Sequence, residues 1–161
     1  MLIYIGSHSF CLAKAYNEYS NKHIVNLGQI DSVMEESQGM IKEGKADAKI
    51  YLKLGTIYAR RMDWQNARSY LEKAIEMDRN TNFAYNNLGN VYFYLENIDK
   101  AIDCYRKAIA INPDYLIARY NLGFAYFKKI QIKDAMKELD FILAKEKNDF
   151  QAWQMRQLIF E

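Results

Sequence analysis

The chain has 161 residues, of which 50% are hydrophobic and 26% are charged, a balance typical of a folded domain and unlike that of a disordered chain. Its 22 Lys and Arg residues against 20 Asp and Glu residues leave a net charge of +2. This near-balance argues against nucleic-acid binding, because proteins of that class carry a clustered positive excess. The chain has a single proline and only seven glycines, few residues for tight hairpins, so the composition favours an all-helical protein.

The first 47 residues predict two helices, over residues 7–20 and 28–43, joined by a linker longer than a tight turn. The chain opens on the apolar run Met1 to Ile5, which lacks the preceding cations of a secretory signal. Cys11 and Cys104 lie far apart and form no CxxC pair, so we expect free thiols in a reducing compartment. No apolar run reaches the roughly 18 residues of a membrane span. Together these features predict a cytoplasmic protein, with a secreted form or one that has a truncated signal as the less favoured alternative.

Beyond residue 47, three segments share one pattern at a period of 34 residues. In each, Leu-Gly is followed by a tyrosine three residues after the glycine, and by an alanine twelve residues after it. The glycines are Gly55, Gly89 and Gly123, and the alanines are Ala67, Ala101 and Ala135. Each copy contains two stretches with the i, i+3, i+4, i+7 apolar spacing of an amphipathic helix. Each segment is therefore expected to form a pair of helices.

This pattern resembles the tetratricopeptide repeat, W-x2-L-G-x2-Y, then A-x3-F, then P. The match covers residues 48–81, 82–115 and 116–149, although Arg119 replaces the aromatic residue of the third copy and only the second copy has the closing proline, Pro113. The resemblance implies an all-α fold, a right-handed superhelix (α-solenoid) of about three repeats. Residues 1–47 would then be a degenerate repeat or an N-terminal helical cap, and residues 150–161 a C-terminal capping helix.

The recurrent glycine has a physical explanation that does not depend on the family. A glycine in a helix interior costs about 1 kcal/mol relative to alanine. Its presence on the apolar face of the first helix of all three copies predicts that the second helix approaches closely there, with its alanines on the other side of the contact.

Catalysis finds little support in the sequence. The chain contains none of the motifs GxSxG, HExxH, GxxxxGK[ST] or GxGxxG. Its two histidines, His8 and His23, have neither a nucleophile nor zinc ligands at a familiar spacing. We therefore expect a protein that is not an enzyme and holds neither a metal nor a cofactor.

The resemblance also implies a binding surface, because the first helix of each tetratricopeptide repeat lines the concave side of the superhelix. The candidate partner-binding residues in this groove are Lys53, Phe83, Asn86, Asn87, Asn90, Phe93, Tyr94, Tyr120, Asn121, Phe124 and Phe127. Family members use asparagines at the positions of Asn87 and Asn121 to hold the backbone of an extended peptide, since a carboxamide is both donor and acceptor. The alternative is that these asparagines bridge neighbouring helices, and the sequence favours neither.

Some family members bind the C-terminal carboxylates of chaperones through two lysines, an arginine and two asparagines. Asn90 and Asn121 match the asparagines of that clamp, whereas Asn86, Gln151 and Met155 stand at its cationic positions. The clamp is therefore absent or incomplete.

The expected function is protein–protein interaction, as a non-catalytic scaffold, adaptor or assembly subunit that binds an extended peptide or a helix of another protein in the groove. The alternative is a regulatory subunit or co-chaperone-like module that modulates a separate enzyme chain. The apolar ends, Met1 to Ile5 and Leu158 to Phe160, suggest in addition a homo-oligomer.

Overall fold

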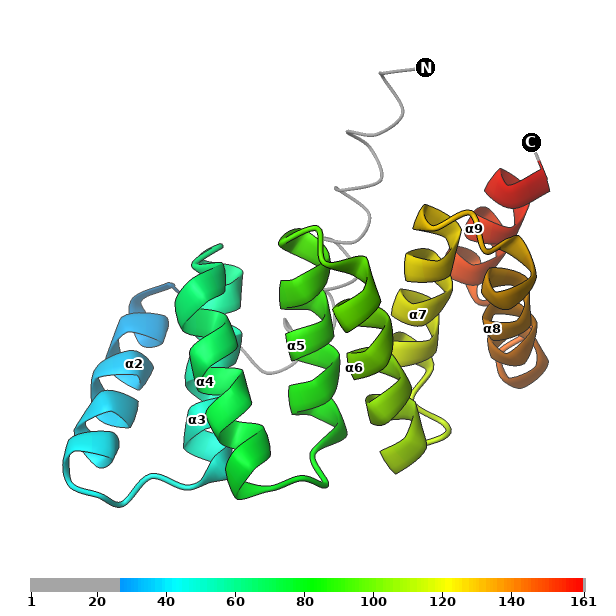
Figure 1. The fold of residues 1–161 in the computed structure, drawn as a ribbon. Helices are drawn as coiled ribbons and strands as arrows, with labels where there is room; N and C mark the ends of the chain where they lie inside the picture. Colours follow the sequence, from blue (N-terminus) through cyan, green and yellow to red (C-terminus); the bar gives the residue numbers. More distant parts are fainter. Residues whose placement is uncertain (1–26, 161) are drawn as a thin grey trace.

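The computed structural model describes residues 27–160, which form eight α-helices and no strand. The helices stand side by side in a curved row with α2 at one end and α9 at the other (Figure 1). Their bounds are α2 Leu27–Lys42, α3 Ala48–Arg60, α4 Trp64–Met77, α5 Asn82–Tyr94, α6 Ile98–Ile111, α7 Leu116–Lys128, α8 Ile132–Lys145 and α9 Phe150–Phe160. The predicted all-α solenoid is confirmed. The helix predicted over residues 7–20 lies outside the described residues.

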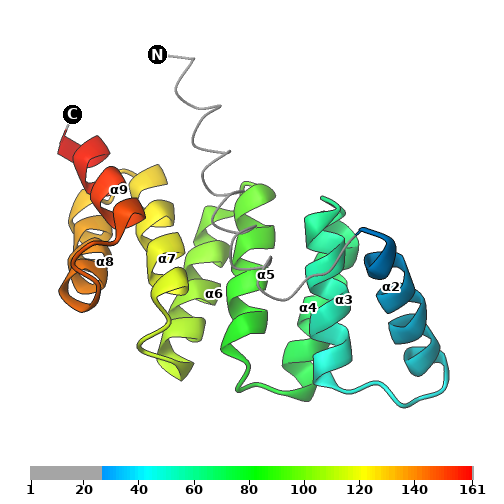
Figure 2. The ribbon, with the colours of Figure 1, turned by 180° about the vertical axis from the view of Figure 1, so that it is seen from behind.

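The helices form two layers. The strongest packing is within the pairs α3–α4, α5–α6 and α7–α8. Each of α3, α5 and α7 also touches the next odd-numbered helix, whereas α4, α6 and α8 do not touch one another within the described part of the chain. Helices that touch across repeats lie on the shorter side of a curved row. We call α3, α5, α7 and α9 the inner helices and α4, α6 and α8 the outer helices; α4 lies in front of α3 in Figure 1 and behind it in Figure 2.

The turn inside each pair repeats one backbone arrangement. The amide of the residue that precedes the outer helix donates to the carbonyl of the motif tyrosine, as in a Schellman-type helix end. These bonds are Asp63 to Tyr58 at 3.0 Å, Asn97 to Tyr92 at 2.8 Å and Gln131 to Tyr126 at 2.9 Å. One residue earlier the backbone is left-handed, with φ of 60° at Met62, 58° at Glu96 and 59° at Ile130. Glycine and asparagine tolerate that conformation best, so the backbone is strained at all three of these residues.

The first two motif glycines lie at tight helix contacts. A Cβ atom at Gly55 would lie 2.6 Å from Cγ of Leu71, and one at Gly89 would lie 2.5 Å from Cε1 of Tyr105. Leu71 and Tyr105 are fully buried, so neither can move aside without disturbing the core. The predicted close approach is therefore confirmed at these two contacts.

The third contact is looser than predicted. A Cβ atom at Gly123 would meet nothing closer than the Ala135 carbonyl oxygen and Glu138 Cβ, both at 3.5 Å, which is ordinary van der Waals contact. The residue equivalent to Leu71 and Tyr105 is Leu139, which packs instead in a cluster with Phe124 and Met155.

The ends of the row are attached by apolar contacts. Met34 of α2 packs against Leu54 and Ile57 of α3. At the other end, α9 packs against α8 and α7, with Ala152 and Met155 buried. No helix in residues 27–160 is long and apolar enough to cross a bilayer.

Candidate functional site

A network of side-chain amides joins the inner helices. Asn121 Nδ2 on α7 donates to Oδ1 of Asn86 at 3.0 Å and to Oδ1 of Asn90 at 3.2 Å, both on α5. Oδ1 of Asn90 also accepts from the hydroxyl of Tyr105 on α6 at 2.8 Å. All four residues are buried. Burial raises the pKa of Tyr105 well above its ordinary value, which keeps the hydroxyl protonated as the donor.

The network continues to α3. Asn86 Nδ2 donates to Oδ1 of Asn87 at 3.3 Å, and Asn87 Nδ2 donates to Oγ1 of Thr56 at 3.0 Å. The Thr56 hydroxyl donates in turn to the carbonyl of Leu52 at 2.8 Å. In this structure the asparagines therefore bridge neighbouring helices. Their predicted role in holding a peptide backbone stays a prediction.

Asn121→Ala should lower the free energy of unfolding by about 1–3 kcal/mol, because it leaves the buried Asn86 oxygen without its Asn121 donor and the Asn90 oxygen with the Tyr105 hydroxyl alone. Chemical denaturation measures the change, with helicity checked by circular dichroism. A variant as stable as the parent would show that the Asn121 amide contributes little to the fold and is available to a ligand.

Aromatic side chains form a second continuous feature of the inner face, running along the C-terminal halves of α5 and α7. Phe93 lies 5.5 Å from Phe124, and Phe124 lies 6.4 Å from Phe127, between ring centroids. Tyr94 contacts Phe93 edge-on at 6.4 Å and stacks on Trp64, the first residue of α4, at 4.6 Å with 9° between the planes. We call these five residues the aromatic series. All but Phe124 remain partly exposed, so the series is a surface that a partner can contact.

Three predicted groove residues lie outside both features. Phe83, at the start of α5, is 42% exposed and meets Tyr115 edge-on at 5.4 Å. Tyr120 is half-buried beside the cluster that contains Phe124, and Lys53 is exposed on α3. Trp64 was missed by the sequence analysis because it belongs to an outer helix, and its contact with Tyr94 depends on how one pair rotates against the next.

The inner helices differ from the outer ones in charge. In their sequences α3, α5, α7 and α9 contain no Asp or Glu, whereas every outer helix carries both signs. Their cations are Lys49, Lys53, Arg60, Arg119, Lys128 and Arg156. Two of these are paired to α8, Arg119 with Glu138 at 2.7 Å and Arg156 with Asp140 at 2.8 Å. The inner helices therefore carry a net positive charge.

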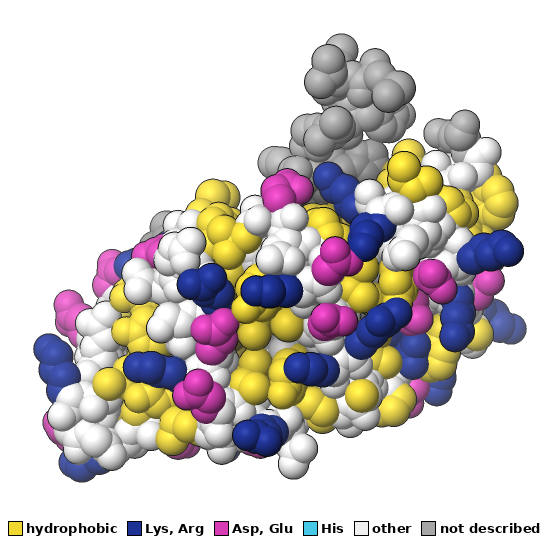
Figure 3. Space-filling view, viewed as in Figure 1, with side chains coloured by type: hydrophobic (Ala, Val, Ile, Leu, Met, Phe, Trp, Pro, Cys, Tyr) yellow, Lys and Arg dark blue, Asp and Glu magenta, His cyan; other side chains and the backbone are white. Residues whose placement is uncertain are grey.

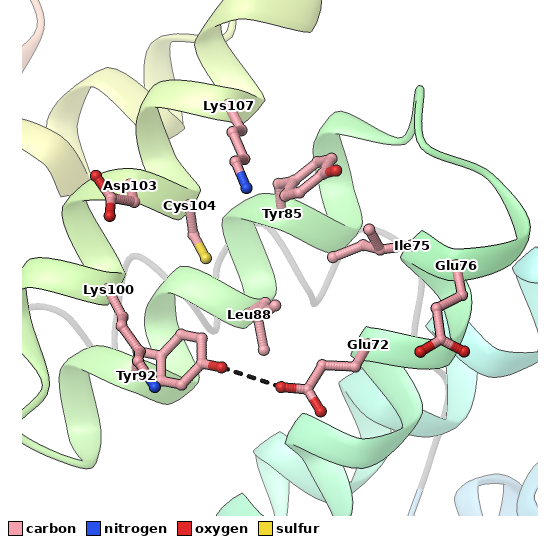
Figure 4. A pocket seen from close by; sticks show the side chains of 10 residues that line it. All are labelled: Glu72, Ile75, Glu76, Tyr85, Leu88, Tyr92, Lys100, Asp103, Cys104 and Lys107. Carbon is pink, nitrogen blue, oxygen red and sulfur yellow. Dashed lines mark hydrogen bonds between the residues drawn. The ribbon is translucent and has the colours of Figure 1, made fainter.

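The outer face has a mixed surface. Figure 3, viewed as Figure 1, shows basic and acidic side chains interspersed among hydrophobic ones over the outer helices. A cleft of about 410 Å³ lies between α4, α5 and α6, with two glutamates, Glu72 and Glu76, on the α4 side and two lysines, Lys100 and Lys107, on the α6 side (Figure 4). The hydroxyl of Tyr92 donates to Oε1 of Glu72 at 3.0 Å.

This cleft recurs one repeat later with its charges exchanged. In the equivalent cleft of about 250 Å³, Arg106 stands where Glu72 stands in the first, and Asp134 replaces Lys100. The tyrosine hydroxyl changes role accordingly, because Tyr126 accepts from Nε of Arg106 at 3.0 Å. A ligand that fits the charges of one cleft therefore meets the opposite charges in the other.

The first cleft, between α4, α5 and α6, is also lined by a cysteine, Cys104, whose thiol is not activated as a nucleophile. Cys104 is a free, buried thiol. Burial raises its pKa to about 11, so it stays protonated at neutral pH, whereas a catalytic cysteine needs a lowered pKa. No cluster of metal-ligating side chains occurs among the residues that the structure describes.

Comparison with known families agrees with this architecture. A model of the tetratricopeptide repeat matches residues 48–81, and a second model, described as TPR repeat, matches residues 89–129. The chain is a tetratricopeptide repeat (TPR) protein. TPR domains are in general non-catalytic folds that bind other proteins.

This TPR protein is 28% identical over 135 residues to the chloroplastic tetratricopeptide repeat domain-containing protein PYG7 of Arabidopsis thaliana, a match covering 81% of this chain and 45% of PYG7. It is 33% identical over 96 residues to the uncharacterized protein ycf37 of Guillardia theta, covering 56% of this chain and 54% of ycf37. The chain thus spans about half the length of these curated relatives. The crystal structure of YrrB, described as a TPR protein with an unusual peptide-binding site, has the same fold, with a TM-score of 0.73 and 20% identity over 88% of this chain and 71% of YrrB.

The prediction of a cytoplasmic protein is wrong. PYG7 is chloroplastic by name, and the ycf37 relatives come from the plastid-bearing organisms Guillardia theta and Porphyra purpurea, so these comparisons point to a chloroplast. The prediction rested on cysteine spacing and the lack of a secretory pattern, neither of which separates one reducing compartment from another.

Proposed function

We propose that this TPR protein works in a chloroplast as a scaffold or assembly subunit, and that its inner face binds an acidic segment of another protein. The observation that carries the proposal is the segregation of charge: the inner helices hold cations and no carboxylates. An interface of that sign attracts an acidic partner and speeds its association. The chloroplast location rests on the relatives named above.

The aromatic series supplies the apolar part of the proposed interface. Aromatic residues and arginine are enriched where proteins bind one another, and buried aromatic anchors contribute most of the binding energy. Lys49, Lys53 and Lys128 are exposed on the inner helices, where they can meet the carboxylates of a partner. We therefore expect a partner segment that alternates acidic residues with large apolar ones.

The amide network argues for the aromatic series, and against the asparagines, as the main anchor. Asn86, Asn90 and Asn121 are at most 8% exposed and already bonded to one another. A peptide backbone could reach them only by breaking buried hydrogen bonds, which would offset the bonds it gains. We therefore expect binding to depend more on Phe93 and Phe127 than on the asparagines.

Capture from a plastid extract with three forms of the protein tests this function. The parent should retain a partner that the triple variant Lys49→Glu, Lys53→Glu, Lys128→Glu loses, because reversing three exposed charges costs roughly 1.5–3 kcal/mol of binding, or about tenfold to a hundredfold in affinity. The matched control, Lys100→Glu with Lys107→Glu on the outer cleft, should retain it. A partner lost from the control and kept by the inner variant would place binding on the outer face.

A further inference from the structure

The last helix of the solenoid carries an apolar stripe that no described element covers. Of the five exposed positions of α9, Phe150, Trp153, Gln157 and Phe160 follow one another at intervals of three, four and three residues, the spacing of a single helix face, and Gln154 is the fifth. Their aromatic members are 70%, 50% and 72% exposed in chain order. Exposed apolar side chains that gather on one face mark an interaction surface, so this stripe needs an explanation.

The stripe lies on the side of α9 that faces an outer helix in the complete pairs. Trp153 and Phe160 stand 102 residues, or three periods, after Tyr51 and Tyr58. Both of those tyrosines stack on Tyr70 of α4, at 6.3 and 5.2 Å between ring centroids. The equivalent side of α9 meets no outer helix within the described residues, and α9 forms the end of the row in Figure 1. The stripe is therefore a helix-docking face.

An ordinary outer helix would fit this face poorly. Gln157 occupies the slot that Gly55 and Gly89 occupy in the first two repeats. At Gly89 even a single Cβ atom would lie 2.5 Å from the partner helix, so a glutamine side chain prevents that close seam. A helix that covers α9 must lie further from α9 than α6 lies from α5 and must make contact through large side chains.

The stripe is symmetric about Met155. Phe150 and Phe160 lie five residues either side of it, and Trp153 and Gln157 two residues either side. In an antiparallel pair of α9 helices related by a two-fold axis, Phe150 of each copy faces Phe160 of the other, and Trp153 faces Gln157. Such a surface is complementary to itself, which is what a symmetric dimer requires.

We propose that a second copy of this chain covers the stripe, through an antiparallel α9–α9 contact. The local charges permit it, because Arg156 is the one charged residue of α9 and it is paired with Asp140 at 2.8 Å. The indole of Trp153 is already held in place: its Nε1 donates to the carbonyl of Lys147 at 2.8 Å, and Arg156 lies 5.5 Å from its ring. A preordered aromatic anchor loses little entropy on binding.

The dimer is expected to be weak. A fully buried aromatic side chain removes about 150–250 Å² from water, so the six partly exposed rings of two copies bury on the order of 500–1,000 Å², below the roughly 1,200 Å² of a stable interface and in the range of weak, transient contacts. The chain should therefore be mainly monomeric at about 1 µM and dimeric at several hundred micromolar, with a dissociation constant in the tens of micromolar.

Sedimentation equilibrium across that concentration range tests the proposal. The average mass should rise from 19.0 kDa toward twice that value. Trp153→Ser should raise the dissociation constant about tenfold or more, as expected for a central aromatic anchor. Met62→Ser is the matched control, since Met62 is as exposed as Phe160, 72% in each case, but lies in the turn between α3 and α4; it should leave dimerisation unchanged. A mass of 19.0 kDa at every concentration would overturn the proposal and leave the stripe to another partner or another helix.

Disulfide trapping tests the antiparallel geometry. In a background of Cys11→Ser and Cys104→Ala, Phe150→Cys and Phe160→Cys proteins should cross-link when mixed and remain largely uncross-linked when oxidised separately. Cross-linking of each protein with itself, and none in the mixture beyond it, would mean parallel helices and would contradict the two-fold pairing. Circular dichroism of each variant confirms that the fold is intact before the oxidation.

Discussion

Gly89→Leu should lower the free energy of unfolding by about 3 kcal/mol or more, whereas Gly123→Ala should raise it by up to about 1 kcal/mol. The two residues occupy the same position of the repeat, so a sequence pattern alone would assign them the same role. The difference arises from their surroundings. A Cβ atom at position 89 would lie 2.5 Å from Cε1 and 2.7 Å from Cδ1 of Tyr105.

Tyr105 cannot yield to a new side chain. It is fully buried, and its hydroxyl is bonded to Asn90 at 2.8 Å, so a larger residue at position 89 separates α5 from α6 and breaks the amide network as well. Overpacking of a core costs about 1–3 kcal/mol and occasionally more. At position 123 the atoms nearest to an added Cβ atom lie 3.5 Å away. Gly123→Ala should therefore recover the roughly 1 kcal/mol of stability that a glycine costs in a helix interior.

Urea denaturation of the parent and both variants measures the two changes. Gly39→Ala is the control for helix propensity alone, because nothing lies within 4 Å of a Cβ at that position in α2, and it should stabilise the protein to a similar extent as Gly123→Ala. A Gly89→Leu protein as stable as the parent would mean that Gly89 does not lie at a tight helix contact.

Glu138→Ala should cost about 3–5 kcal/mol, the loss expected when one member of a buried ion pair is removed. Glu138 and Arg119 are only 11% and 13% exposed at their side chains. Arg119 also donates from Nε to the carbonyl of Pro113 at 2.9 Å, and its guanidinium lies 3.5 Å from the ring centroid of Phe141. Without Glu138 the guanidinium stays in this enclosed position with its charge uncompensated.

The two preceding repeats suggest a second substitution that should restore the stability lost in Glu138→Ala. One period earlier the same two positions hold Tyr85 and Cys104, and two periods earlier they hold Tyr51 and Tyr70, which stack at 6.3 Å. The double variant Arg119→Tyr, Glu138→Tyr should therefore recover most of the lost stability, because apolar packing can replace a buried ion pair at little cost.

Thermal and chemical denaturation compare the single and the double variant. Asp140→Asn, which breaks the more exposed pair with Arg156, should change stability by less than about 1 kcal/mol. A single variant Glu138→Ala as stable as the parent would show that the Arg119–Glu138 pair contributes little to the fold.

The periodic features of the sequence predicted the architecture well, because a 34-residue period determines which residues face the core within each pair. The helix expected over residues 28–43 is α2, at Leu27–Lys42, and three helix pairs follow it. The repeat boundaries at residues 48–81, 82–115 and 116–149 stay predictions, since helix bounds alone do not divide a solenoid into repeats.

The interactions between repeats could not be predicted. Whether Asn121 faces the groove or bonds to Asn86 and Asn90, and whether Trp64 reaches Tyr94, depends on the angle between successive pairs, which no spacing within one repeat encodes. The loose contact at Gly123 has the same origin. The stripe on α9 was different, since its three-four-three spacing is visible in the sequence, but only the structure shows that no described helix covers it.

Binding of the partner by the inner face can be tested by titration. Once a partner has been captured and identified, its affinity is measured for the parent, for the inner variant Phe93→Ala, Phe127→Ala and for the outer variant Lys100→Glu, Lys107→Glu, each checked for helicity. We expect the inner variant to lose about tenfold or more in affinity, as for aromatic interface anchors, and the outer variant to keep its affinity. The parent should bind more weakly as salt increases. Full affinity of a folded inner variant, with loss of affinity in the outer one, would mean that the partner binds the outer face.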